Sequence, residues 1–209
     1  MELRAPKRDL RDTGARAVPL VVGAYALVGA LGLAIGALRG EPNVFVTRSL
    51  RLSGERSSGH LASALGGLAL ALLVVALTRA LVRSQAWAAA LHEDLAPVAR
   101  ALGSGAVVPV ALASSLGEEL LFRGALVPWI GVAASSALFG LLHQVPGRSR
   151  AAWIAFASVV GALLGALFVV TGSLLGPILA HALVNAVNLR FLQTHEPPRA
   201  RPGDRRLRR

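Results

Sequence analysis

Long apolar stretches separated by short polar or charged segments dominate this sequence. Six of them, roughly 18–38, 60–82, 105–127, 130–145, 151–170 and 173–192, approach the ~20 residues that a helix needs to cross a bilayer. The fourth is short and would need tilt or local thinning of the bilayer. The pattern therefore predicts an all-α fold, a polytopic membrane helix bundle of about six transmembrane helices.

The composition supports a membrane protein. Of the 209 residues, 54% are hydrophobic and only 16% are charged, which is too apolar for a soluble domain of this length. The chain has no cysteine, so disulfides, thiolate catalysis and cysteine-based metal sites are excluded. The net charge of +11 lies in the tails and loops with little aromatic interleaving, so we expect a lipid bilayer as partner and no nucleic acid.

The distribution of the 22 Lys and Arg residues predicts the orientation. With a cytoplasmic N-terminus, 17 of them lie inside and only Arg39, Arg48, Arg51 and Arg56 lie outside, if the intramembrane Arg123 is set aside. We therefore expect both termini in the cytoplasm and the first span to be retained as a helix. A cysteine-free chain rich in Ala and Arg suggests a high-GC bacterium, and so a bacterial inner membrane.

Four regions follow from this organisation. They are a basic cytoplasmic arm (1–17), two N-terminal spans with an amphipathic connector (18–99), a catalytic helix core (100–192) and a basic tail (193–209). The segment 39–59 is expected to be a linker-like outer loop, and 84–100 an amphipathic interfacial helix. In that helix His92 has the neighbours Glu93 and Asp94, which do not share a helix face, so a solvated polar face is expected rather than a metal cluster. For His60, His92 and His195 we expect surface or capping roles.

Glu118 and Glu119 are the only acidic residues inside the apolar spans. A charge in the middle of a bilayer costs at least a few kcal/mol, so two adjacent carboxylates there indicate a function. Glu119 and Arg123 have the favourable four-residue spacing of a helical ion pair. Glu118 lies about 100° around the helix and lacks this partner, so we expect Glu119 and Arg123 to be structural and Glu118 to be free for chemistry.

Polar residues on two later spans are expected at the same depth as Glu118. Phe139 and His143 share a face at i and i+4, and His181, Asn185 and Asn188 form a stripe. From the turn near residues 128–131, Glu118 and His143 each lie roughly 19 Å deep at 1.5 Å per residue, and Asn185 lies roughly 18 Å deep on the sixth span. Any one of these residues could simply tie two helices together, but their matched depth favours a common site.

Three motifs carry a resemblance to a known family. Glu118-Glu119-x-x-x-Arg123, Phe139-x-x-x-His143 and His181-x-x-x-Asn185, in this order on successive apolar segments, resemble the CPBP family of intramembrane proteases. That family, also called the CAAX protease and bacteriocin-processing or Abi family, includes the endopeptidase that trims prenylated CAAX proteins. The resemblance covers about residues 100–192.

The resemblance implies an intramembrane endopeptidase that hydrolyses a peptide bond in a membrane-associated protein or peptide. Glu118 and His143 would activate water, and His181 and Asn185 would stabilise the oxyanion. Glu119, Arg123, Phe139 and Asn188 would support them. Glycines near the motifs, namely Gly117, Gly124, Gly140 and Gly176, would permit close helix approach.

The sequence leaves the cofactor and the activity open to alternatives. Glu118, His143 and His181 could instead hold zinc with an open position for water, although no His-Glu-x-x-His motif is present and we favour a mechanism without metal. A non-proteolytic membrane immunity or scaffold protein of the same fold is the main alternative, and a proton-coupled transporter ranks third because no inverted repeat is visible. As substrate we favour a bacterial membrane-anchored or secreted peptide.

Overall fold

The structure, a computed structural model, describes residues 10–48, 56–145, 147 and 149–196. The basic arm up to residue 9, the centre of the predicted outer loop and the tail from residue 197 lie outside the described residues. The helices are α1 (Leu10–Leu38), α3 (Arg56–Ser84), α4 (Ala86–Leu102), the 3₁₀ turn η1 (Ser104–Ala106), α5 (Val107–Glu118), the π-helical η2 (Glu119–Leu126), α6 (Val127–Leu142), α7 (Arg150–Thr171) and α8 (Leu175–Thr194).

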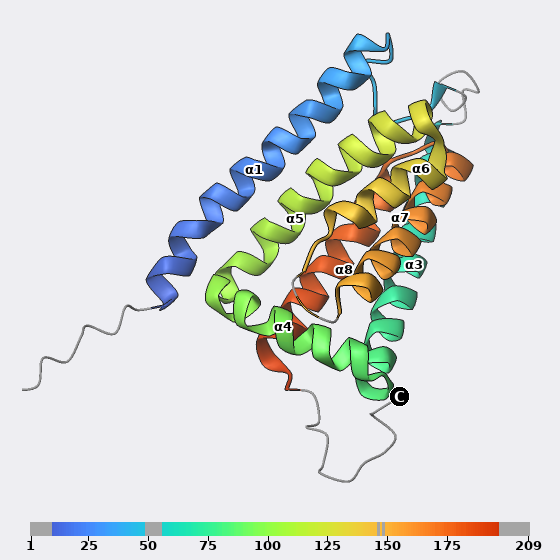
Figure 1. Cartoon of the computed structure of the whole chain (residues 1–209). Helices are drawn as coiled ribbons and strands as arrows, with labels where there is room; N and C mark the ends of the chain where they lie inside the picture. The colour runs from blue at the N-terminus through green and yellow to red at the C-terminus, as the bar shows by residue number, and fades with distance from the viewer. Residues whose placement is uncertain (1–9, 49–55, 146, 148, 197–209) are drawn as a thin grey trace, which may run out of the picture.

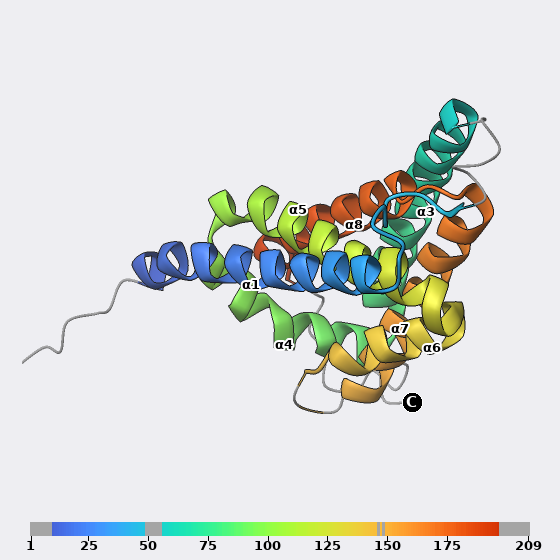
Figure 2. The ribbon, with the colours of Figure 1, turned by 90° about the horizontal axis from the view of Figure 1, so that it is seen from above.

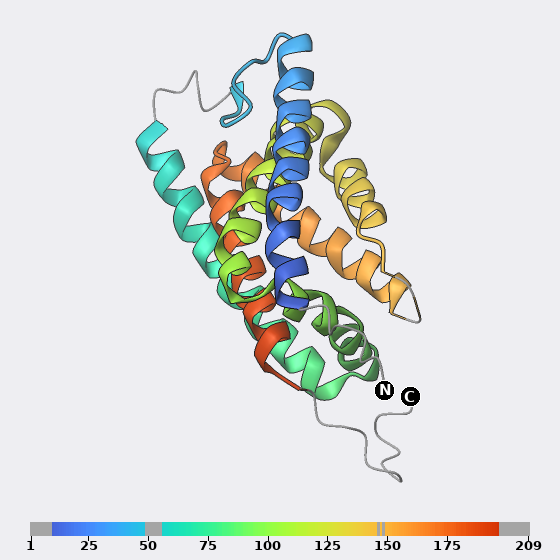
Figure 3. The same cartoon turned by 90° about the vertical axis from the view of Figure 1, so that its left-hand side faces the viewer.

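The long helices form a bundle that α4 crosses at one end (Figure 1). Seen from above, α6 and α7 lie together on one side of the bundle, while α3 and α8 lie on another (Figure 2). The first described turn of α1 and the last turn of α8 both lie at the end of the bundle that α4 crosses, the α4 end (Figure 3).

The predicted fold class is confirmed, because the described residues form an all-helical bundle with long apolar helices. Within these residues, five helical stretches are long and apolar enough to cross a membrane. One of them, Ser104–Leu142, contains the predicted third span and residues 130–142 of the predicted fourth. Its backbone leaves the helical region at Gly131, with φ 81° and ψ 168°, where a residue with a side chain would be strained, so the chain reverses there. Many large apolar side chains face outward, as lipid-facing positions require; Leu20, for example, is 77% exposed.

Close helix approach at glycine is also confirmed. A Cβ added at Gly117 would clash with the Tyr25 carbonyl of α1, and one at Gly176 would clash with the backbone of Ser63 in α3. At Gly140 an added Cβ would lie 2.6 Å from the Ile154 carbonyl oxygen of α7. Small residues therefore bring α1, α3 and α7 against the motif-bearing helices, as dispersion packing between membrane helices requires.

The outer segment after α1 is more ordered than the linker-like loop that the sequence suggests. Val44 is 3% exposed and packs in a cluster with Leu120, Phe168 and Leu174. The Thr47 N–H donates to the Gly172 carbonyl at 2.8 Å, and the Leu174 N–H donates to the Phe45 carbonyl at 2.9 Å. The prediction of a linker is wrong for residues 44–47, because a short apolar segment there closes the bundle opposite the α4 end.

The segment expected as an amphipathic connector forms α4, but the expectation that His92 lies on a solvated polar face is wrong. Glu93 and Asp94 are exposed, whereas His92 is 3% exposed. Its Nε2 donates to the His195 carbonyl at 2.9 Å, and its ring meets Phe191 edge-on at 5.0 Å. His92 thus joins α4 to the end of α8, because the face of α4 that turns inward includes the histidine. His60, half-buried on α3, hydrogen-bonds the Ser173 hydroxyl at 2.7 Å, which is a local structural role.

Candidate active site

The Glu118-Glu119-x-x-x-Arg123 motif lies where α5 changes into the π-helical segment η2. Such wide turns are rare and frequently occur at functional sites. The expected pair is present: Arg123 Nη1 donates to Glu119 Oε1 at 2.9 Å, and both side chains are almost completely buried. The guanidinium also stacks over the Phe139 ring at 4.3 Å and lies beside Gly161 of α7, where an added Cβ would be 3.1 Å from Arg123 Nη2.

His181 of α8 lies between the two glutamates. Its Nδ1 is 2.7 Å from Glu119 Oε1, and its Nε2 is 3.5 Å from Glu118 Oε2. A carboxylate accepts and the Nδ1–H donates, so Glu119 determines which ring nitrogen carries the proton. The expectation that Glu119 only pairs with Arg123 was therefore incomplete, because a helix far along the chain delivers a second partner to the same oxygen.

His143 ends helix α6, with non-helical φ −82° and ψ 74°. Its Nδ1 is 2.7 Å from the carbonyl oxygen of Phe139, one of the helix-terminal carbonyls that have no intrahelical partner. A carbonyl can only accept, so Nδ1 carries the proton and a neutral His143 keeps a free lone pair on Nε2. The i, i+4 spacing of Phe139 and His143 thus positions the imidazole, and the two rings are 4.3 Å apart.

The two asparagines of α8 have different surroundings. Asn185 Nδ2 donates to the Ser114 hydroxyl of α5 at 2.9 Å, which leaves a second N–H on this amide. Asn188 accepts from Arg79 Nη1 at 2.7 Å and from the Thr78 hydroxyl at 3.3 Å. Asn185 is thus oriented by one partner and keeps a donor, whereas Asn188 ties α8 to α3.

A cavity of about 350 Å³ brings several of these groups together. His143, His181 and Asn185 line it, and so do Phe139, Ser114 and Asn188. Glu118 does not itself line the cavity but adjoins it through His181, and its side chain is 12% exposed. The remaining walls are largely apolar, from Leu70, Val110, Ala157, Leu164 and Val184. Such a cavity can hold water and an extended peptide segment beside polar groups in an otherwise apolar bundle.

Sequence reasoning missed Tyr25, the single tyrosine of the chain. It lines the cavity from α1 and lies close enough to Glu118 for the two groups to interact electrostatically. Gly117 holds it there, because the backbone of α1 contacts α5 directly at Tyr25. No motif lies beside this tyrosine in the sequence, and one tyrosine in an apolar span does not indicate a function. Only the helix packing identifies it.

The geometry of the possible ligands bears on the zinc alternative. Among the described residues, no three His, Asp or Glu side chains converge in a way that could hold a metal ion. In the arrangement present, Nδ1 of His143 is bonded to a carbonyl, and Nδ1 of His181 is bonded to Glu119. These bonds leave Nε2 of both rings open to a water molecule or to a metal ion.

Two unsatisfied buried polar atoms remain in the centre of the site. Glu119 Oε2 and Arg123 Nη2 have no hydrogen-bond partner within the described part of the chain. Buried polar groups of this kind are normally bonded, and unpaired ones occur at functional sites or beside water. Both atoms belong to the pair that supports His181, so the polarity of the site is concentrated around this imidazole.

Comparison with known proteins agrees with the motifs. Residues 100–187 match the family model of type II CAAX prenyl endopeptidase Rce1-like proteins, which confirms the resemblance to the CPBP family. An 83-residue stretch is 35% identical to the uncharacterized protein YpbD of Bacillus subtilis; it covers 39% of this chain and 42% of that protein. The chain thus matches less than half the length of this relative. No solved structure matches the chain.

Proposed function

We propose that this chain is an intramembrane endopeptidase, proceeding from the match of residues 100–187 to the Rce1-like family. The observation that carries the proposal is the position of His181, bonded to Glu119 and 3.5 Å from Glu118, in a cavity that His143 and Asn185 also line. The reaction would hydrolyse a peptide bond in a membrane-associated protein or peptide.

Water activation falls to Glu118 and His143 in this proposal. The Nδ1–H of His143 is held by the Phe139 carbonyl, so its Nε2 lone pair can accept a hydrogen bond from water in the cavity. Glu118 then takes the proton as the water oxygen attacks the carbonyl carbon, and passes it to the leaving amine. A carboxylate suits this task because it can act as a base in the first step and, once protonated, as an acid in the second.

Oxyanion stabilisation falls to His181 and Asn185. Because Glu119 accepts from Nδ1, a proton on Nε2 makes His181 an imidazolium that can donate to the developing negative charge. Asn185 offers the N–H that Ser114 does not occupy. Glu119 thus acts as a positioning residue for His181, and Arg123 fixes Glu119 in turn.

A genetic experiment tests the proposal even though the substrate is unidentified. Membrane peptides are compared between a strain lacking the gene and the same strain carrying wild-type protein, Glu118→Gln or Glu93→Gln. We expect precursor peptides to accumulate with Glu118→Gln but not with the control, because Glu93 is exposed on α4. Loss of a general base typically lowers the rate about 10²–10⁴-fold. Equal processing by Glu118→Gln and wild type would refute the assignment of Glu118.

The same profiles separate the alternative function. An immunity or scaffold protein of this fold would protect or bind without turnover, so the deletion strain would show no accumulated precursor and Glu118→Gln would complement fully. The polar groups around His181 favour the enzyme, because a binding protein has no need of two carboxylates beside one buried imidazole.

Metal dependence is tested on purified protein. We propose a mechanism without metal, and expect activity to survive prolonged chelation and dialysis. Loss of activity with metal-specific rescue, together with about one zinc per chain by elemental analysis, would replace this mechanism with a zinc-dependent one at the same residues.

A further inference from the structure

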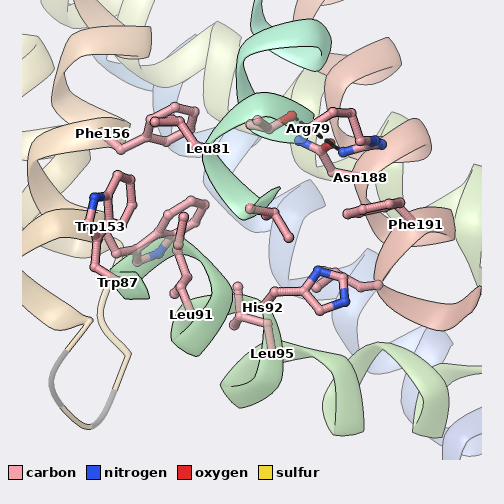
Figure 4. A pocket seen from close by; sticks show the side chains of 14 residues that line it. Arg79, Leu81, Trp87, Leu91, His92, Leu95, Trp153, Phe156, Asn188 and Phe191 are labelled. Carbon is pink, nitrogen blue, oxygen red and sulfur yellow. Dashed lines mark hydrogen bonds between the residues drawn. The ribbon is translucent and has the colours of Figure 1, made fainter. Parts of the chain in front are cut away.

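A second, smaller pocket lies next to the cavity at the α4 end of the bundle. It has a volume of about 100 Å³ and is lined by residues of α3, α4, α7 and α8 (Figure 4). Trp87, Trp153 and Phe156 form one side of this α4 pocket, whereas Arg79, Asn188 and His92 lie on the other (Figure 4).

The polar side chains of the α4 pocket are already bonded to protein. Arg79 donates to Asn188 and to the Val187 carbonyl, and its guanidinium lies 3.7 Å above the Phe191 ring. His92 donates to the His195 carbonyl. With these groups engaged, the remaining lining is apolar, from Leu81, Val82, Leu91, Leu95 and Leu192. The chemistry of the pocket therefore suits an apolar group and not a charged one.

The α4 pocket adjoins the candidate active site. Leu95, Trp153, Phe156, Asn188 and Leu192 line both spaces. The Trp153 ring centre lies 6.0 Å from that of His143 and 5.8 Å from that of Phe156, against which it stacks. One aromatic ring, that of Trp153, therefore lies between His143 and the α4 pocket.

We propose that the α4 pocket is a specificity subsite that holds one medium-sized apolar side chain of the peptide, next to the bond that is cut. This inference rests on the proposed function. The volume sets the size class, because an engineered apolar cavity of about 150 Å³ accommodates benzene. A pocket of about 100 Å³ accommodates a leucine-sized group.

The test measures cleavage preference in purified, reconstituted protein. The probe is a set of fluorogenic peptide mixtures in which one position at a time is fixed as Ala, Leu, Phe or Asp. Wild type is expected to favour Leu over Ala about tenfold or more in kcat/KM at one position, since one extra methylene in a fitted apolar pocket contributes about 10- to 200-fold. Leu91→Trp should lower kcat/KM for the Leu mixture to about that for the Ala mixture, because the indole fills the pocket.

Two further variants test whether the preference depends on the size of the pocket. Leu91→Ala enlarges the pocket and should shift the preference from Leu towards Phe. Val98→Trp adds the same indole to the same helix at a position that is 62% exposed and outside the pocket, and should leave the preference unchanged. Wild-type cleavage without an apolar preference at any position, or an unchanged preference in Leu91→Trp, would overturn the subsite and leave the proposed function standing.

A binding measurement covers the case in which no mixture is cut. A short neutral peptide carrying bromophenylalanine quenches tryptophan fluorescence on contact, and Trp87 and Trp153 line the pocket. In a Trp129→Phe background, which removes the third tryptophan, saturable quenching that Leu91→Phe weakens and Val98→Phe retains would support the subsite, because neither variant adds a tryptophan. Absence of saturable quenching would overturn it. Cleavage that is unaffected by Glu118→Gln would instead count against the proposed function alone.

Discussion

The buried Glu119–Arg123 pair provides the most direct test of how the site is held together. Both side chains lie inside the bundle, with exposures of 0% and 1%, and Nη1 of Arg123 is 2.9 Å from Oε1 of Glu119. Replacing either residue by methionine removes one charge and leaves the other without its counter-ion in an apolar environment. The perturbation is a double-mutant cycle with Glu119→Met, Arg123→Met and the double variant.

The expected magnitude follows from the burial. Breaking a buried ion pair by removing one partner costs about 3–5 kcal/mol, because the remaining charge is uncompensated. We expect each single variant to lose stability in this range. The double variant should lose about 2–3 kcal/mol less stability than the two single variants lose together. Recovery will be incomplete because His181 loses its acceptor at 2.7 Å when Glu119 is replaced.

The assay is reversible unfolding of the purified protein in mixed micelles, followed by circular dichroism. The internal control is the exposed pair Arg100–Glu196, with a separation of 3.9 Å and exposures of 44% and 77%. The equivalent cycle there should give a coupling of less than about 1 kcal/mol, because solvent screens surface ion pairs.

Two results would refute the reasoning. Additive losses for Glu119→Met and Arg123→Met would show that the two residues are not energetically paired. A coupling equal to that of Arg100–Glu196 would show that burial does not strengthen the pair.

Proteolytic activity provides a separate test of the same variants. The double variant should fold and yet remain inactive, because His181 is no longer positioned by Glu119. Full activity in the double variant would contradict the positioning role.

Three further predictions follow from particular contacts. Gly117→Ala should lower stability by about 1–3 kcal/mol because its Cβ would meet the Tyr25 carbonyl, whereas Gly23→Ala, with nothing within 4 Å, should not; thermal unfolding compares them. Burial lowers the pKa of His92 below its ordinary 6.5, so the unfolded state binds more protons, and stability should be full above about pH 6.5 and fall as the pH drops. His92→Gln should remove this pH dependence, measured by unfolding from about pH 7.5 to about 5; an unchanged dependence would refute it. A reporter that works only in the cytoplasm should be active when it is fused at Arg209, and a reporter that works only outside the cytoplasm should be inactive there.

Hydropathy along the chain is sufficient to predict much of this fold. The spans, the turn at residues 128–131, the amphipathic α4 and the close approach at glycines such as Gly117 all follow from local periodicity and residue size. The Glu119–Arg123 pair also follows, since a spacing of four residues keeps two side chains together even in a π-helical segment. These features depend on residue size, on the length of an apolar stretch, or on neighbours within one helix; for the glycines the sequence indicates that a helix can approach but not which helix does.

Contacts between helices were decided only by the tertiary structure. Helix geometry assigned different roles to Glu118 and Glu119. In the structure His181 lies between them, so one imidazole contacts both glutamates. Tyr25 reaches the site only because α1 crosses α5 at Gly117, and His92 is buried only because α4 lies against the end of α8. An amphipathic pattern states that a face is buried and does not state against which helix. The partner depends on how all backbones pack together, and that is information the local sequence does not contain.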